Sequence, residues 1–216
     1  MIPGMKIFAH IAAAACVAAA FVSPANAHPH VWVTVTSQVV YDANGAATGV
    51  RHAWKFDDMY SAFALEGLPQ KTKGVFTRED LAGLAEVNIS TLKDSDFFTY
   101  AKAGSKDVPF GEASDYWLDY KDEVLTLNFT LPFKTPLKEK NFSIEVYDPS
   151  YFVDFGFAEK DAVALVGAPA QCQAAIQKPK QATAAPGQQL MSDAQAMAMM
   201  DNWGQNFASK IAVKCP

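Results

Sequence analysis

Hydrophobic and polar residues alternate along much of this chain with the period of a β-strand. The clearest run covers residues 30–41, where valines at every second position line one side of an extended chain. The pair Asn44-Gly45, a favoured turn sequence, comes next, and residues 50–57 alternate again. The two runs predict an antiparallel hairpin near the beginning of the fold.

The predicted hairpin determines which side chains lie opposite one another. With a two-residue loop, His52 lies opposite Ser37 and Asp57 lies opposite Trp32, with Asp58 next to it. At about 3.3 Å per residue, His52 is then roughly 23 Å along the strand from the histidines that precede the first run. We therefore expect the two aspartates, and not His52, to lie near those histidines.

Two segments with helical character interrupt the strands. Residues 60–65 predict a short helix, and Thr77 with Asp80 is typical of the start of a longer one. Strands with one or two inserted helices indicate an α+β fold with a mainly antiparallel sheet, for which a sandwich is one arrangement. The later strand-like segments are 97–102, 116–120, 124–133, 142–147, 151–157 and 162–166.

The composition changes after residue 166, which we take as the end of an α+β domain formed by residues 28–166. Residues 167–190 are rich in Ala, Gln, Pro and Gly and predict a linker. Ser192 then begins a segment with helical spacing of methionines, so residues 191–216 are expected to form a C-terminal helical tail. We interpret the methionines as the packing face of that helix, with a copper site as the alternative.

The first 27 residues have the three parts of a secretory signal peptide. Lys6 precedes an apolar run over residues 7–22, and Ala25-Asn26-Ala27 forms a cleavage site of small residues. The run is shorter than the roughly 20 residues that span a membrane as a helix. We expect export to the periplasm and a mature chain that begins at His28. An uncleaved anchor and a lipoprotein attached at Cys16 are the alternatives.

Charge and cysteine content agree with export. Removal of the signal peptide takes away one lysine and changes the net charge from −5 to −6. An acidic chain without a basic stripe argues against a nucleic-acid partner. The mature chain keeps Cys172 and Cys215, and such a pair in an oxidising compartment predicts one disulfide. A thiolate metal site is the alternative, which an oxidising compartment disfavours.

The candidate chemistry lies at the expected start of the mature chain. His28 and His30 fall on one side of an extended chain, and the α-amine of His28 can bind the same ion. Pro29 has no amide hydrogen, which blocks the copper-binding mode that uses deprotonated backbone amides. Together with Asp57 or Asp58, these donors predict a site for Zn²⁺, with Ni²⁺, Co²⁺ and Cu²⁺ as other ions. The alternative is that the two histidines belong to a merely polar chain start.

A second group of polar residues follows one of the later strands. Asp148-Pro149-Ser150 predicts a turn, in which Asp148 either caps backbone amides or, like Asp154, supplies a further oxygen to the metal. The sequence motifs of serine hydrolases, zinc proteases, phosphate-binding loops and EF-hands are absent. We therefore do not expect an enzyme.

Three of these segments together resemble a known family. They are His28-Pro29-His30-Val31-Trp32, Trp54-Lys55-Phe56-Asp57-Asp58 and Tyr147-Asp148-Pro149-Ser150-Tyr151-Phe152. Over about residues 28–160, the chain resembles largely uncharacterised exported bacterial proteins that are similar to periplasmic zinc-binding partners of nickel/cobalt-type permeases. The resemblance implies that His28, His30, Asp57 and Asp148 serve metal delivery to such a permease. The family usually has Asp-Glu at the place of Asp57-Asp58.

Three hypotheses about function follow. The first is a periplasmic accessory protein that binds a divalent metal ion, with zinc as the first candidate, and delivers it to an inner-membrane permease. The second is a copper-binding oxidoreductase with an N-terminal histidine site, and the third is an interaction domain that binds no metal. Only the first two need His28 and His30, which makes these residues the discriminating ones.

Overall fold

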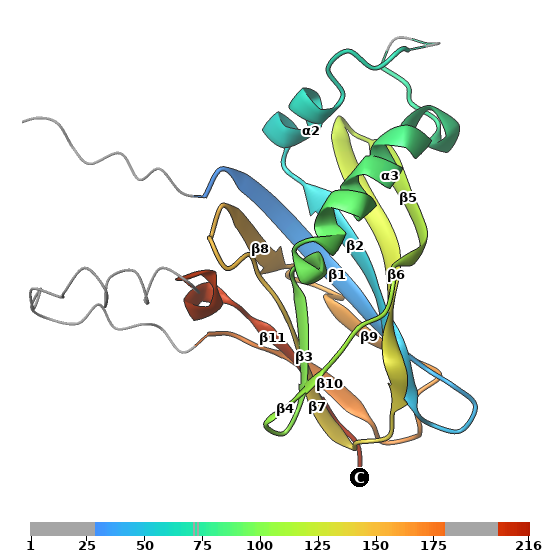
Figure 1. Ribbon diagram of the computed structural model, residues 1–216, viewed down its shortest axis with the longest axis vertical. Coiled ribbons are helices and arrows are strands. Elements are labelled where there is room, and N and C mark those ends of the chain that lie inside the picture. The colour runs from blue at the N-terminus through green and yellow to red at the C-terminus, as the bar shows by residue number, and fades with distance from the viewer. Residues whose placement is uncertain (1–28, 71, 73, 180–202) are drawn as a thin grey trace, which may run out of the picture.

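The computed structural model describes residues 29–70, 72, 74–179 and 203–216. In these residues two β-sheets pack against each other, and two helices lie at one end of the molecule (Figure 1). Trp54 and Phe129 of the first sheet share one buried core with Ile144 and Val213 of the second sheet. The α+β class is confirmed, and the sandwich is the arrangement that the chain adopts.

The first sheet has the strand order β5-β6-β2-β1-β8, and β9 also pairs with β1. β1 is antiparallel to β2 but parallel to β8 and β9, so this sheet is mixed. The parallel pairs arise because the chain passes through the second sheet before it returns to β1. The strands are β1 (Val31–Tyr41), β2 (Ala47–Phe56), β5 (Ser114–Lys121), β6 (Val124–Leu137), β8 (Val153–Phe157) and β9 (Val163–Val166).

The second sheet has the order β10-β11-β7-β3-β4, and its composition corrects the prediction of a C-terminal helical tail. The chain ends in a strand, in which Ile211 and Val213 are buried against the core and alternate with Lys210, Ala212 and Lys214. Residues 191–202 of the expected tail lie outside the described part, and β10 falls within the expected linker 167–190. The strands are β3 (Thr99–Ala103), β4 (Lys106–Val108), β7 (Asn141–Val146), β10 (Gln173–Gln177) and β11 (Lys210–Lys214).

The β1–β2 hairpin has the predicted pairing over its central part, where Ser37 lies opposite His52. Its turn differs from the prediction. The backbone N–H of Asp42 donates to the carbonyl of Ala46 at 2.9 Å, which leaves three residues in the loop instead of two. Thr48 then bulges out of β2 and restores the predicted register.

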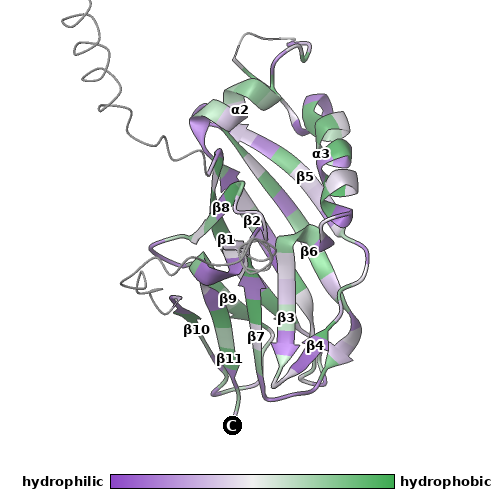
Figure 2. Cartoon of the chain, turned by 60° about the vertical axis from the view of Figure 1, so that its left-hand side comes forward, coloured by the Kyte–Doolittle hydropathy of each residue, from purple (hydrophilic) through white to green (hydrophobic). Residues whose placement is uncertain are grey.

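Both helices begin at side chains that cap them. α2 (Asp58–Ala64) follows Asp57, and α3 (Arg78–Lys93) follows Thr77, which forms the predicted capping box with Asp80. α3 packs beside β5 through a buried face with residues four positions apart (Figures 1 and 2). That face consists of Leu81, Ala85 and Ile89.

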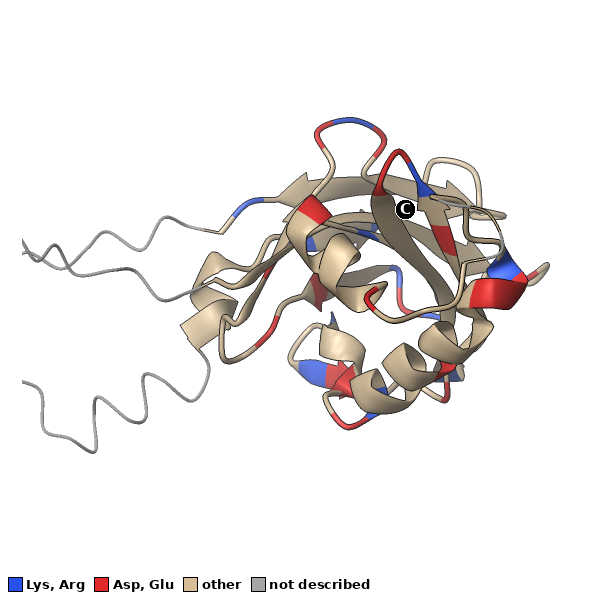
Figure 3. Ribbon diagram, turned by 90° about the horizontal axis from the view of Figure 1, so that it is seen from above, with Lys and Arg blue, Asp and Glu red and all other residues tan. Residues whose placement is uncertain are grey.

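The surface and the cross-link agree with several expectations. Cys172 and Cys215 form a disulfide, as predicted, between the beginning of β10 and the end of β11. Basic and acidic residues are interspersed in the view of Figure 3, without a continuous basic stripe among the coloured segments. None of the helices in the described ranges has the length and hydrophobicity that a bilayer crossing requires.

Candidate functional site

His30 lies immediately before β1, on the rim of the first sheet. Its backbone N–H donates to the carbonyl of Phe152 at 2.9 Å, and its ring centroid lies 4.7 Å from that of Phe152. The residue is exposed to solvent. The two contacts therefore hold an imidazole at the surface, next to the start of β8. His28 lies outside the described residues.

Asp57 connects this rim to α2. Its Oδ2 accepts the backbone N–H of Trp32 at 2.8 Å, and its Oδ1 accepts that of Tyr60 at 2.7 Å. Its carbonyl accepts the hydroxyl of Ser61 at 2.6 Å, and this buried hydroxyl in turn accepts the N–H of Leu125 in β6. Asp57 is thus an N-cap that fixes α2 to β1 and β6.

A test of this structural role needs no metal. Asp57→Ala removes two hydrogen bonds to backbone N–H groups, and we expect it to lower the free energy of unfolding by about 1–2 kcal/mol. The exposed neighbour gives a control, since within the described ranges Asp58 accepts only the N–H of Met59 and its change to Ala should stay within about 0.5 kcal/mol. Urea unfolding in the presence of a chelator measures both. Equal stability of the two variants would contradict the capping role.

Asp148 is buried, with 5% of its surface exposed, and it holds the turn between β7 and β8. Its Oδ1 accepts the N–H of Ser150 at 2.8 Å, and its Oδ2 accepts the N–H of Val153 at 3.0 Å. The Ser150 hydroxyl donates to the same carboxylate. These are the capping contacts that were one of the two predictions for Asp148. Because the turn carries Phe152, Asp148 positions the ring on which His30 rests.

The C-terminal segment covers this turn. In η2 (Trp203–Phe207), the N–H of Gly204 donates to the carbonyl of Pro149 at 3.0 Å, and the ring of Phe207 stacks on Tyr151 at 4.5 Å. A Cβ atom at Gly204 would lie only 1.8 Å from the carbonyl oxygen of Asp148, so the close approach requires glycine here. The chain end is therefore part of the support of the rim.

The structure brings together only part of the site that the sequence predicted. His30 and Asp57 approach the same rim, since Asp57 binds the amide of Trp32, two residues after His30. Asp58 is exposed at the first turn of α2, and Asp148 faces its own turn. Within the described ranges, no three His, Cys, Asp or Glu side chains lie close enough to hold a metal ion. A metal site at this rim would need donors from outside those ranges.

The structure places Asp154 beside Trp32, a position that the sequence alone did not show. Parallel pairing makes it the partner of Trp32 and places it on the same face of the sheet. Burial raises the pKa of its carboxyl group above the usual value. The sequence named Asp154 as a further oxygen donor, but nothing in the local pattern indicated that β8 runs parallel to β1.

His52 lies in the core, away from the rim. Its Nδ1 lies 2.9 Å from the hydroxyl of Ser37, and its ring packs against Trp54 and Phe129. Burial lowers its pKa to about 3, which keeps the imidazole neutral.

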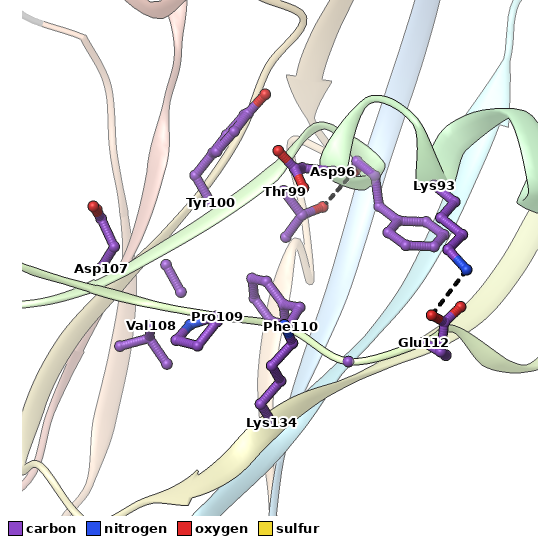
Figure 4. A pocket seen from close by; sticks show the side chains of 13 residues that line it. Lys93, Asp96, Thr99, Tyr100, Asp107, Val108, Pro109, Phe110, Glu112 and Lys134 are labelled. Carbon is purple, nitrogen blue, oxygen red and sulfur yellow. Dashed lines mark hydrogen bonds and ion pairs between the residues drawn. The ribbon is translucent and has the colours of Figure 1, made fainter.

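A cleft of about 470 Å³ lies elsewhere, between the end of α3, β3 and residues 107–112 (Figure 4). Three of the charged residues that line it are in ion pairs: Lys93 binds Glu112 at 2.9 Å, and Asp107 binds Lys102 at 3.5 Å. Residues 96–98 above it have left-handed φ angles of 46–51°, an uncommon conformation that packs two consecutive phenylalanines against the core. The lining contains none of the residues that the sequence predicted as metal ligands.

Comparisons with known proteins cover nearly the whole chain. A relative from Haemophilus influenzae with the description "Uncharacterized protein" is 24% identical over 193 residues, which are 88% of this chain and 91% of the relative. A family model described as "Protein of unknown function (DUF1007)" matches residues 13–215. The protein belongs to this family.

Proposed function

We propose that this protein is a periplasmic accessory protein that binds a divalent metal ion and delivers it to an inner-membrane permease of the nickel/cobalt type. The observation that carries the proposal is the rim at the start of β1. There His30 is exposed and held by Phe152, and Asp57 lies beside the next residues of the strand. His28, two positions before His30, adds a second imidazole and an α-amine.

The donor set favours zinc as the cargo. Imidazole nitrogens and carboxylate oxygens are ligands of Zn²⁺, and Ni²⁺, Co²⁺ and Cu²⁺ accept the same donors. A site with few protein ligands at an exposed rim leaves coordination positions for the donors of a receiving protein. The disulfide between Cys172 and Cys215 supports an oxidising compartment such as the periplasm.

Isothermal titration with zinc, nickel and copper tests the proposal. Replacement of both His28 and His30 by Ala should weaken zinc binding by roughly 100-fold or more, because two imidazole ligands are lost. Affinity should also fall in acid, since protons compete for the imidazoles and the amine. His52→Gln is the control, because this histidine is buried and should leave zinc affinity unchanged.

The position of the chain start gives a finer test. One extra residue before His28 should reduce affinity if the α-amine is a ligand, whereas unchanged affinity would assign binding to side chains alone. Dissociation constants above about 1 mM for all three ions would end the proposal. An absorption spectrum of bound copper together with reductant-dependent oxygen consumption would favour the oxidoreductase hypothesis instead.

A further inference from the structure

The face of the first sheet that points away from the second sheet carries a polar groove of about 480 Å³. Its floor is a row of cross-strand neighbours that spans four strands. Thr36 pairs with Ala53, Ala53 with Asn128, and Asn128 with Trp117. Ala53, the smallest side chain of the row, lies between Thr36 and Asn128. The residues next to the row, Val35, Trp54, Leu127 and Leu118, are fully buried on the opposite face.

The aromatic wall of the groove is Trp117, and its indole ring is fixed in place. Its Nε1–H donates to Oδ2 of Asp119 at 2.8 Å. The guanidinium of Arg78 lies 4.6 Å from the ring centroid, over one face of the indole. Trp117 lines the groove as well as a second hollow next to Arg78. An aromatic ring held at its edge and on one face offers a preformed apolar surface to a ligand.

Asp119 also orients the polar floor. Its Oδ2 accepts Nδ2–H of Asn128 at 3.1 Å, and a further N–H of this amide reaches the carbonyl of Thr126 at 3.3 Å. The amide oxygen of Asn128 has no donor among the residues that the structure describes. One carboxylate thus positions both the ring and the amide that line the groove.

One rim of the groove is formed by an irregular strand. Between Ser114 and Trp117 the register of β5 shifts by one residue against β6, and Asp115 within this bulge has a φ of 47°. Bulges redirect side chains and occur preferentially next to functional sites. Asp115 lines the groove at this rim, and Asp161, from the connection between β8 and β9, lines it at the other.

Arg51 lies between these two aspartates in the lining of the groove. In the described part of the chain its guanidinium has neither an ion pair nor a hydrogen bond to another side chain. Its partners across the strands are Gln38 and Thr130, which are uncharged donors and acceptors. The groove therefore combines one cation and two carboxylates with amides and hydroxyls, a balance that suits a neutral ligand with many hydroxyl groups.

We propose that this groove binds a short oligosaccharide. A sugar ring has an apolar face of C–H groups, which matches the part of the Trp117 indole that lines the groove, and a rim of hydroxyls that both donate and accept hydrogen bonds. The planar groups of Asn128 and Arg51 and the carboxylate of Asp115 supply the matching partners. The row across four strands gives the groove an elongated shape, roughly three strand spacings or about 14 Å long.

Titration of the purified protein with cellotetraose, chitotetraose and maltotetraose tests this proposal. We expect at least one of the three to bind, and Trp117→Ala to weaken that binding about tenfold. Ala53→Phe, which fills the floor beside Asn128 and leaves Trp117 in place, should have the same effect. Trp203→Ala is the matched control, because this tryptophan lies in η2 and should leave sugar binding unchanged.

Circular dichroism and the unfolding midpoint show whether each variant is folded, and Ala53→Phe decides the question if Trp117→Ala does not fold. The proposal is overturned if none of the three sugars binds at about 10 mM. It is equally overturned if binding persists in the folded groove variants, because the sugar would then bind elsewhere.

Discussion

Acidification should remove about 5 kcal/mol of the free energy of unfolding through His52 alone. This histidine is 3% exposed, and burial lowers its pKa from 6.5 to about 3. Between these two values the unfolded chain binds a proton that the folded protein rejects, so stability falls as the pH decreases. The full contribution is present above pH 6.5 and is lost on the way to pH 3.

Urea unfolding of the wild type and of His52→Gln over this pH range measures the effect. The wild type also loses stability through its carboxylates, so the difference between the two pH dependences isolates His52. Gln keeps a polar group opposite Ser37 but has no charge to gain. Parallel curves for wild type and His52→Gln would contradict the prediction.

Removal of the disulfide should lower the free energy of unfolding by about 4 kcal/mol. The bond between Cys172 and Cys215 closes a loop over 43 positions and restricts the unfolded chain accordingly. It also holds the ends of β10 and β11 together, where Gln173 pairs with Lys214. The double change Cys172→Ser and Cys215→Ser avoids a free thiol.

Chemical unfolding of this double variant and of the wild type gives the difference directly. Reductant should destabilise the wild type to a similar extent and leave the variant unaffected, which serves as the internal control. A loss below about 1 kcal/mol would contradict the entropic account, in which most of the stabilisation comes from the unfolded state. The two largest effects thus come from one buried imidazole and one cross-link.

Strong local signals made much of the fold predictable. The alternating valines of β1 predicted a half-buried strand, and Thr77 with Asp80 predicted the start of α3. The end of the chain was predicted wrongly, because only Ile211 and Val213 mark β11 and a methionine-rich segment with helical spacing precedes it. Five residues carry too little periodicity to outweigh such a neighbour.

Contacts between distant segments could not be predicted from the pattern of hydrophobic and polar residues. The spacing of Val153 and Phe155 fits a parallel strand as well as an antiparallel one, so the pairing of β8 with β1 could not be predicted. For the same reason Phe152 was not expected beneath His30. The hairpin register did predict that Asp57 lies close to Trp32, because that contact depends on a local turn.

The groove could not be predicted from the sequence either, because its residues come from separate hairpins. Trp117 and Asn128 belong to one hairpin, but the floor also needs Thr36 and Ala53 from another. The bulge at Asp115 has no glycine or proline to mark it in the sequence. Only the paired strands reveal that these side chains share one surface.

The parallel position of β1 also has a consequence for the order of events during biogenesis. Among the described residues β1 is the first strand to be synthesised, yet its partners in β8 and β9 lie more than a hundred positions later. Contacts of such long range slow folding, because distant segments must meet before they gain anything from pairing. Until then one side of β1 stays open to strands of other molecules, and a chain cut short after β7 would keep this aggregation-prone edge permanently.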